Sequence, residues 1–347
     1  MRRIEIIAWI CAVIGLAGAA FGWITDPDAF APAWLAALDA WLLWPLGALA
    51  LVLAHSLTGG RWGEAARPGL MAGIVTLPLL IPGLVPILLF LPRLYHWARP
   101  EEIGHVKNGF WLNPTFFMVR MAIYVVIWLA IAFIVLGQSR RGRSAGRFAA
   151  PALIVLALSF TVTSIDLTLS LEDFNSNIYG MIRATSAGIL ALAIATLVAM
   201  PVTGREVMAD LAKLLLALVI LWTYLDFMQL LIVWQSNLAI DSGWYVHRTI
   251  PYWGFIAIGL EVFRFAVPFL VLVIPQWQRS RFALALVCLL LIATTILRSW
   301  WLVLPALDRG IGVFDVACML VFAGLAGGTA CRSAMRFQVK REAVGHV

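Results

Sequence analysis

Apolar runs of about 20 residues recur along this chain from one end to the other. Because a helix rises about 1.5 Å per residue, each run is long enough to cross the roughly 30 Å of hydrocarbon in a bilayer. The residues are 63% hydrophobic and only 12% charged, with a mean hydropathy of +0.94, which is far from the balance of a soluble globular domain. We therefore predict an all-α, polytopic integral membrane protein.

The apolar runs predict ten transmembrane helices in a single transmembrane domain, residues 1–347. No fixed-period repeat or low-complexity linker divides the chain, and the loops are short. The first run follows Arg2 and Arg3 but lacks a small-residue cleavage site, so we expect a retained helix rather than a signal peptide. The predicted spans are 4–24, 35–57, 69–91, 114–137, 148–170, 178–200, 208–236, 251–275, 282–303 and 312–331.

Prolines punctuate the third run at Pro78, Pro82 and Pro86. Proline lacks the N–H group that continues a helix, and its ring crowds the preceding turn. We therefore expect a bent helix with freed backbone carbonyls at this place.

Basic residues are unequally divided between the two sides of the predicted bundle. An even number of spans places both termini on one side, and that side carries fifteen arginines and lysines against five on the other. The positive-inside rule then predicts cytoplasmic termini. The fifteen are Arg2, Arg3, Arg61, Arg67, Arg140, Arg141, Arg143, Arg147, Arg205, Arg279, Arg281, Arg332, Arg336, Lys340 and Arg341, and the five are Arg93, Arg99, Lys107, Arg248 and Arg309. Topology and anionic lipid headgroups account for the net charge of +7, which gives no argument for a nucleic-acid partner.

Residues that hold redox cofactors are scarce. The four cysteines form no CxxC pair, and of the five histidines only His55 lies in a predicted span. A membrane b-type haem normally takes two axial ligands from helices. We expect no metal, haem or iron–sulfur cluster bound by this chain.

The segment "SIDLTLSLEDFNSNIYG", residues 164–180, places three carboxylates at the end of the fifth run, on Asp166, Glu172 and Asp173. Polar residues precede them at intervals of three and four, which marks one helix face about 21 Å long. That face consists of Ser159, Thr163, Asp166, Ser170 and Asp173.

A lipid-facing carboxylate near the bilayer centre costs about 3 kcal/mol, so this face must meet protein or water. One interpretation is a proton path in which Asp166 loads and releases a proton between hydroxyl groups. The alternative is helix packing, with the same hydroxyls and the carboxylate bonded across a helix interface.

Other predicted spans contain matching charges. Asp226 and Gln229 share a face of the seventh run, and Glu261 and Arg264 are three residues apart in the eighth. The remaining arginines inside runs are Arg120, Arg183 and Arg298. These cations are candidate charge partners, and the alternative to a relay is that Glu261 pairs with Arg264 and Asp166 with one of the other arginines.

Six segments resemble successive motifs of one family, the F subunit of alternative complex III, a bacterial quinol:cytochrome c oxidoreductase. They cover roughly residues 55 to 255, in order and with matching spacing. The segments are "HSLTGGRWGEAARP" from His55, "LPRLYHWARPEE", "KNGFWLNPTFFMVRMAIYVVIW", "SIDLTLSLE", "LAKLLLALVILWTYLDFMQLLIVWQSNL" and "WYVHR".

The resemblance implies a subunit related to the NrfD-like membrane anchors of polysulfide and nitrite reductases, built from four-helix bundles. In that family a sister membrane subunit, beside the iron–sulfur subunit, is where quinol oxidation is generally placed. The F-like subunit is commonly labelled quinone-binding, and its buried carboxylates are proposed as part of a proton path. The residues of this chain that match the motifs are Lys107, Asn113, Arg120, Asp166, Ser170, Leu171, Glu172, Gln229, Trp234 and Asn237.

This chain departs from the family pattern beside the acidic residues. The family has Trp after the Asp and Pro-His-Trp after the Glu, where this chain has Leu167 and then Asp173, Phe174 and Asn175. After Asn237 the family has Pro and acidic residues, where this chain has Leu238, Ala239, Ile240 and Asp241. A proton exit supplied by the missing imidazole must here come from Asp173 or Asn175.

Together these features predict a non-redox membrane subunit of a quinol-oxidising respiratory complex in the bacterial inner membrane. The chain would contribute assembly, a quinone contact and a proton path, as part of an oxidoreductase rather than as a catalyst alone, with no catalytic residue of its own. Its partners would be other membrane, multihaem cytochrome and iron–sulfur subunits, and lipid. The predicted path uses Asp166 as carrier, Glu172 and Asp173 as the release group, Asp226 and Glu261 as further relays, and the hydroxyls of Thr163 and Ser170.

A stand-alone ion-coupled transporter, or an assembly factor for a terminal oxidase, is the alternative function. A transporter typically has two related halves with broken helices in matching positions. The sequence indicates one proline-rich span, the third, without a clear counterpart in the second half.

Overall fold

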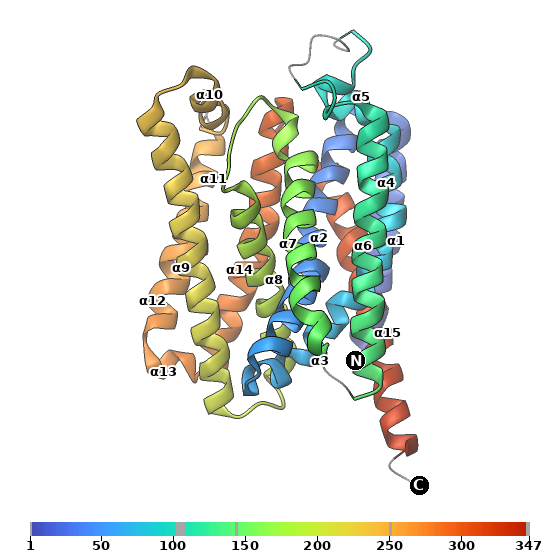
Figure 1. Cartoon of the computed structure of the whole chain (residues 1–347), viewed down its shortest axis with the longest axis vertical. Helices are drawn as coiled ribbons and strands as arrows, with labels where there is room; N and C mark the ends of the chain where they lie inside the picture. The colour runs from blue at the N-terminus through green and yellow to red at the C-terminus, as the bar shows by residue number, and fades with distance from the viewer. Residues whose placement is uncertain (1, 102–107, 143–144, 250–251, 345–347) are drawn as a thin grey trace.

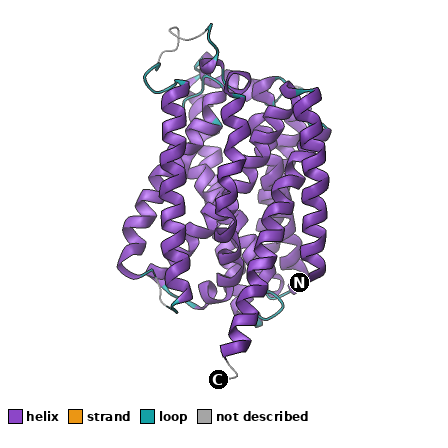
Figure 2. Ribbon diagram, turned by 90° about the vertical axis from the view of Figure 1, so that its right-hand side faces the viewer, coloured by secondary structure: helices purple, strands orange, loops and turns teal. Residues whose placement is uncertain are grey.

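The structure is a computed structural model that describes residues 2–101, 108–142, 145–249 and 252–344. Lys107 and Arg143 therefore lie outside the described residues. Within them every regular element is a helix, and ten helices or helix series are long and apolar enough to cross a membrane. Figures 1 and 2 show these helices running side by side along the long axis of the molecule. The prediction of an all-α, multi-pass membrane protein is confirmed.

Six of the ten spans are single continuous helices. These are α1 (Arg2–Thr25), α2 (Pro27–Thr58), α6 (Pro114–Arg140), α8 (Tyr179–Ala199), α9 (Arg205–Ser236) and α15 (Val313–Val344). Helix α2 begins eight residues before its predicted start, because Pro27 opens the helix and the Asp26 carboxylate accepts a 2.9 Å hydrogen bond from the Ala29 N–H. A helix start predicted from hydropathy alone misses such a cap, because the capping residues are polar.

Four spans are composite. They are α3 (Arg61–Thr76) with η1 (Leu77–Leu79) and α4 (Leu80–Leu89); η3 (Gly146–Phe148) with α7 (Ala149–Leu167) and η4 (Leu169–Leu171); α11 (Tyr252–Leu260) with η5 (Glu261–Ala266) and α12 (Val267–Val273); and α14 (Arg281–Val303) with η6 (Pro305–Leu307). Shorter helices lie in the connections: α5 (Leu91–Leu94), η2 (His96–Ala98), α10 (Ala239–His247) and α13 (Pro275–Gln278).

The third span is interrupted where the prolines predict it. Helix α3 ends at Thr76, and the 3₁₀ turn η1 contains Pro78 before α4 resumes the α-helix. Since Pro78 has no N–H to donate to the preceding turn, the chain tightens locally instead of continuing the α-helical ladder.

A second interrupted helix, which the sequence analysis did not predict, is found in the eighth span. The segment η5 is a π-helix, in which the N–H of Val267 bonds to the carbonyl of Val262, five residues back. Pro268 follows directly and cannot donate to the carbonyl of Arg264. The widened turn absorbs one extra residue at this place.

Helices α2 and α8 pack against each other in the interior of the bundle. Helices α3, α7 and α14 contact this central pair, while α6 covers α7 and α3, and α9 covers α8. Helices α1 and α15 pack together at the edge of the bundle, and α1 begins and α15 ends at the same end of it (Figure 1). We call this the terminal end.

Small residues permit the closest helix contacts. A Cβ added at Gly47 of α2 would overlap the carbonyl oxygen of Ala187 in α8, and one added at Gly15 of α1 would lie 2.6 Å from the backbone nitrogen of Val321 in α15. Close approach through small residues is the usual packing mode between helices in lipid, where apolar association by itself is weak.

Substitution of Gly47 by alanine should therefore lower the stability of the α2–α8 pair by about 1–3 kcal/mol, because the backbones must separate to admit the methyl group. Gly188→Ala is the matched control, since a Cβ there lies 3.5 Å from the Leu218 side chain, which is an ordinary contact. Thermal unfolding of both variants in the same detergent measures the difference. Equal melting temperatures for the two variants would contradict the close contact at Gly47.

Candidate functional site

Among the described residues, four largely buried arginine–carboxylate pairs lie toward the end of the bundle opposite the terminal end, in addition to the exposed pair of Arg93 with Asp28. Each joins residues from different helices or loops, so each pair also cross-links the fold. The pairs are Arg120 with Asp166, Arg183 with Asp39, Arg298 with Asp226, and Arg248 with Glu172.

Asp166 has no exposed surface, and four hydrogen bonds surround its carboxylate. Arg120 makes a two-pronged contact, with Nε 2.9 Å from Oδ2 and Nη2 2.9 Å from Oδ1. Trp111 donates from Nε1 to Oδ1 at 3.0 Å, and the Tyr124 hydroxyl donates to Oδ2 at 3.2 Å. A carboxylate with this many donors suits a permanent ion pair. The geometry favours the ion-pair interpretation of Asp166 over the relay.

The hydroxyl groups of the predicted polar face are bonded to backbone carbonyls of their own helix. Thr163 donates to the Ser159 carbonyl and Ser170 to the Asp166 carbonyl, both at 2.7 Å. Ser159 also accepts a 2.9 Å hydrogen bond from Trp128 Nε1 of α6. The described hydrogen bonds do not connect these hydroxyls to the Asp166 carboxylate. This arrangement is typical of helix packing.

Glu172 and Asp173, predicted as one release group, take different partners. The Glu172 carboxylate lies 2.5 Å from Arg248 Nη2 and 2.9 Å from His247 Nδ1. The Asp173 side chain is 88% exposed and lies 3.8 Å from His96 Nε2. Only Glu172 is therefore part of the buried network.

Arg248 follows α10 and was counted in the sequence only as a loop cation, but its side chain is fully buried. It donates to the carbonyls of Trp244 and Leu302 at 2.9 and 2.8 Å, and its guanidinium lies 3.8 Å from the centre of the Trp244 ring. Burial lowers the pKa of Arg248, and the neighbouring Glu172 carboxylate acts in the opposite direction. Arg248 thus ties the α10 segment to the end of α14.

Asp39 of α2 is a buried, charged residue that the sequence analysis missed. It accepts a hydrogen bond from Arg183 of α8, and both side chains are buried. Its second oxygen, and Nε of Arg183, have no hydrogen-bond partner among the described residues. A lone carboxylate inside the apolar second run was a usable signal, because such a residue needs a partner.

Asp226 has no cation within reach on its own helix, α9. Its partner is Arg298 of α14. The guanidinium Nη2 lies 2.5 Å from Asp226 Oδ1, and the exposed fractions of the two side chains are 14% and 8% for Asp226 and Arg298. The Arg298 guanidinium also lies 4.3 Å from the centre of the Trp301 ring. Asp226 and Arg298 are thus brought together across α9 and α14.

Arg264, in the π-helix η5, is fully buried but has few acceptors. Its Nη1 donates to the Thr295 hydroxyl at 2.8 Å, and its guanidinium lies 4.5 Å from the centre of the Trp222 ring. Its Nε and Nη2 atoms have no hydrogen-bond partner among the described residues. Buried guanidinium donors without acceptors are costly, so this arginine is the least satisfied of the buried cations.

Of the two alternatives for Glu261, the ion pair with Arg264 is not formed among the described residues, and Glu261 is exposed on the surface of the helix. The prediction assumed α-helical spacing, in which residues three apart share a face. In the wider π-helical turn the two side chains are offset from each other, so Arg264 is fully buried whereas Glu261 is exposed.

A line of polar side chains leads from Asp226 toward the end opposite the terminal end. Gln229, one turn further along α9, accepts a hydrogen bond from the Ser176 hydroxyl and donates to the Tyr245 hydroxyl at 3.3 Å. Burial, and then the negative charge of Asp226, raise the pKa of Tyr245 to about 12. Tyr245 is therefore a neutral phenol at physiological pH that both donates and accepts hydrogen bonds.

In comparisons with known proteins, no family model matches the chain and no curated protein matches it significantly. Among the described residues, no group of three or more His, Cys, Asp or Glu side chains is placed to hold a metal ion. The candidate site consists of the unsatisfied Arg264, its neighbours Arg298 and Asp226, and the exposed Glu261.

Asp166→Asn should lower stability by about 3 kcal/mol, because it leaves the buried Arg120 without its counter-charge. The matched control is Asp173→Asn, the same chemical change at an exposed position, where we expect an effect within about 0.5 kcal/mol. Thermal unfolding in detergent compares the two. A stable Asp166→Asn protein with altered proton transfer would instead support the relay interpretation.

Proposed function

We propose that this protein is a non-redox membrane subunit of a quinol-oxidising respiratory complex in the bacterial inner membrane, resembling the F subunit of alternative complex III. The chain would contribute to assembly, to a quinone contact and to a proton path, with both termini cytoplasmic. The ordered motif resemblance over residues 55 to 255 supports the respiratory assignment and is the only support for the quinone contact. The excess of basic residues on the terminal end supports the orientation.

The observation that carries the proton path is that an unsatisfied buried arginine and an exposed carboxylate lie on the same π-helix without forming an ion pair. Ionisable residues inside membrane spans are costly and mark functional positions. Interruptions of the π type also occur frequently at functional sites. Arg264 and Glu261 combine both features within one turn of the eighth span.

The π-helix supplies a means of moving the Glu261 carboxyl group. If the extra residue shifts along the helix, residues 261–264 regain α-helical spacing and Glu261 turns toward Arg264 and Arg298. Away from the guanidinium groups the neutral acid is favoured, whereas between two guanidinium groups the carboxylate is favoured. One cycle between these positions would carry one proton.

Release from this position would proceed along α9. Asp226 and Gln229 lie on one face of that helix, and Gln229 reaches Ser176 and Tyr245 near the end opposite the terminal end. This chain of hydroxyl and amide groups supports a short hydrogen-bonded exit.

In this proposal Asp166 has a structural role instead of carrying protons. Its pair with Arg120, and the pair of Asp39 with Arg183, hold helices α6, α7, α2 and α8 in register. The proposed path therefore moves from α7, where the polar face suggested it, to α9, α11–η5–α12 and α14.

One structural observation favours the alternative of a stand-alone ion-coupled transporter. The sequence indicates one broken span, but the structure contains two, at η1 in the third span and at η5 in the eighth. Broken helices in both halves of a chain are typical of transporters. An assembly factor for a terminal oxidase has no comparable support.

Purification of the tagged chain from its native membranes in a gentle detergent separates these functions. We expect multihaem cytochrome, iron–sulfur and further membrane subunits to co-purify, as identified by mass spectrometry and a haem spectrum. A tagged unrelated multi-pass protein from the same membranes controls for non-specific capture. Recovery of the chain alone would contradict the subunit assignment and favour the transporter.

Glu261→Gln should lower proton translocation at least about tenfold while changing stability little, because the carboxyl group titrates but makes no ion pair in the structure. Glu206→Gln, an exposed carboxylate of α9 at the terminal end, is the matched control. The proton-to-electron ratio of the assembled complex, or acidification of proteoliposomes containing the chain alone, measures the effect. Wild-type proton transfer in the Glu261→Gln protein would eliminate this path.

A further inference from the structure

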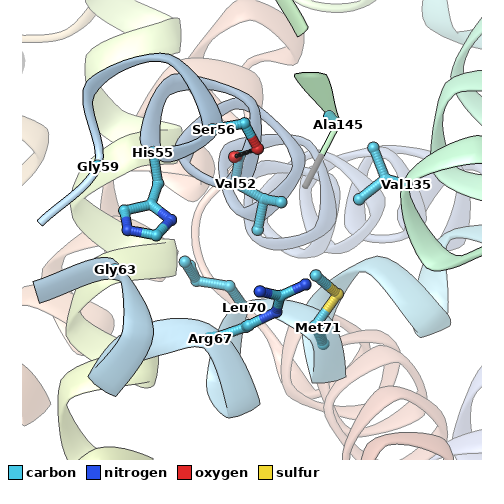
Figure 3. A pocket seen from close by; sticks show the side chains of 10 residues that line it. All are labelled: Val52, His55, Ser56, Gly59, Gly63, Arg67, Leu70, Met71, Val135 and Ala145. Carbon is cyan, nitrogen blue, oxygen red and sulfur yellow. Dashed lines mark hydrogen bonds between the residues drawn. The ribbon is translucent and has the colours of Figure 1, made fainter. Parts of the chain in front are cut away.

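A cavity of about 210 Å³ opens at the terminal end of the bundle, where α2 ends and α3 begins (Figure 3). Its apolar wall includes Val52, Leu70, Met71 and Val135. Its polar side chains include His55 and Arg67. The cavity lies at the opposite end of the bundle from the candidate proton site and shares no residue with it.

Arg67 is a half-buried cation without a carboxylate partner in this cavity. Its one hydrogen bond among the described residues runs from Nη2 to the neutral Ser139 hydroxyl at 3.2 Å. A guanidinium has five N–H donors, so several remain available. Figure 3 shows the guanidinium between Leu70 and Met71, at the cavity.

The carboxylates at this end of the bundle that form ion pairs do so with other cations. Glu64 precedes Arg67 by three residues in α3, but it is exposed and forms no ion pair among the described residues. The pairs that are formed are Asp210 with Arg61 and Lys213, Glu206 with Arg279, and Glu5 with Arg332. The charge of Arg67 is thus available to a bound anion.

His55 contributes a second polar group at a defined place. Its Nε2 lies 2.9 Å from the Gly60 carbonyl, and because a carbonyl only accepts, Nε2 carries the proton of that bond. Nδ1 is then left to bond a ligand hydroxyl when neutral, or to donate when the ring is protonated. The ring is held in place by Trp62, 5.2 Å away edge-on, and by Gly63, where any Cβ would overlap it.

A cation without a carboxylate partner at the end of the spans, beside a cavity with an apolar wall, matches a phosphate that carries acyl chains. Basic pockets between transmembrane helices are known binding sites for anionic headgroups, and guanidinium groups bind phosphate through paired hydrogen bonds. We propose that this cavity binds the phosphate group of an anionic phospholipid. Arg67 is its ion partner, His55 bonds a headgroup hydroxyl, and the apolar wall contacts the first methylene groups. This proposal does not depend on the respiratory assignment.

Native mass spectrometry of the purified, delipidated full-length chain, titrated with phosphatidylglycerol and separately with phosphatidylcholine, tests the proposal. We expect one tightly bound phosphatidylglycerol, and at least tenfold weaker binding in Arg67→Gln, which removes a charge-assisted contact. Arg147→Gln is the matched control, because it makes the same change at an exposed arginine that does not line the cavity. It should bind like the wild type.

Met71→Trp keeps every charge but fills the cavity, and it should also weaken phosphatidylglycerol binding at least tenfold. Wild-type affinity in this variant, or equal losses in Arg67→Gln and Arg147→Gln, would overturn the proposal, because the lipid would then bind outside the cavity. Displacement of the lipid by inorganic phosphate at equal concentration would identify a free anion as the ligand instead. A short-chain quinone that binds the wild type and Arg67→Gln equally, but not Met71→Trp, would overturn it in favour of a quinone site.

Discussion

A charged side chain inside hydrocarbon has no water to solvate it, and the whole bundle is arranged around that constraint. Arg120, Arg183 and Arg298 each reach a carboxylate on a different helix. Because one unpaired buried charge costs several kcal/mol, each pair restricts both the rotation and the depth of two helices at once. The close glycine contacts then complete the packing, since apolar helix faces gain little by leaving lipid.

Arg264 is the exception, and its environment explains why it is informative. The π-helix that separates it from Glu261 is adjacent to Pro268, which cannot close the normal turn. A nearby conformation with α-helical spacing would satisfy the arginine and bury the carboxylate. A protein that keeps this arrangement bears the cost of unsatisfied buried donors at one place, and ionisable residues inside a membrane span commonly mark functional positions.

The two ends of the bundle use their cations differently. Toward the end opposite the terminal end, most buried arginines form ion pairs with carboxylates of the same chain, so their positive charges are largely neutralised inside the protein. At the terminal end, exposed arginines pair loosely with surface carboxylates, and Arg67 remains available beside an apolar cavity. The first arrangement holds the helices in register, and the second leaves a cation for contact with anionic lipid.

Hydropathy and backbone chemistry act locally, so the number of spans, the break at Pro78 and most of the charges inside the spans, although not Asp39, could be predicted from the amino-acid sequence. Which charges meet depends on the packing of the helices. Asp166 and Arg120 are 46 residues apart, and Asp39 and Arg183 are 144 apart, so their pairing follows from helix order and rotation. The same holds for Glu261 and Arg264, whose predicted pair assumed a regular helix. Whether a helix ladder widens beside a proline depends on what its neighbours can accommodate, and that information is spread over the whole bundle.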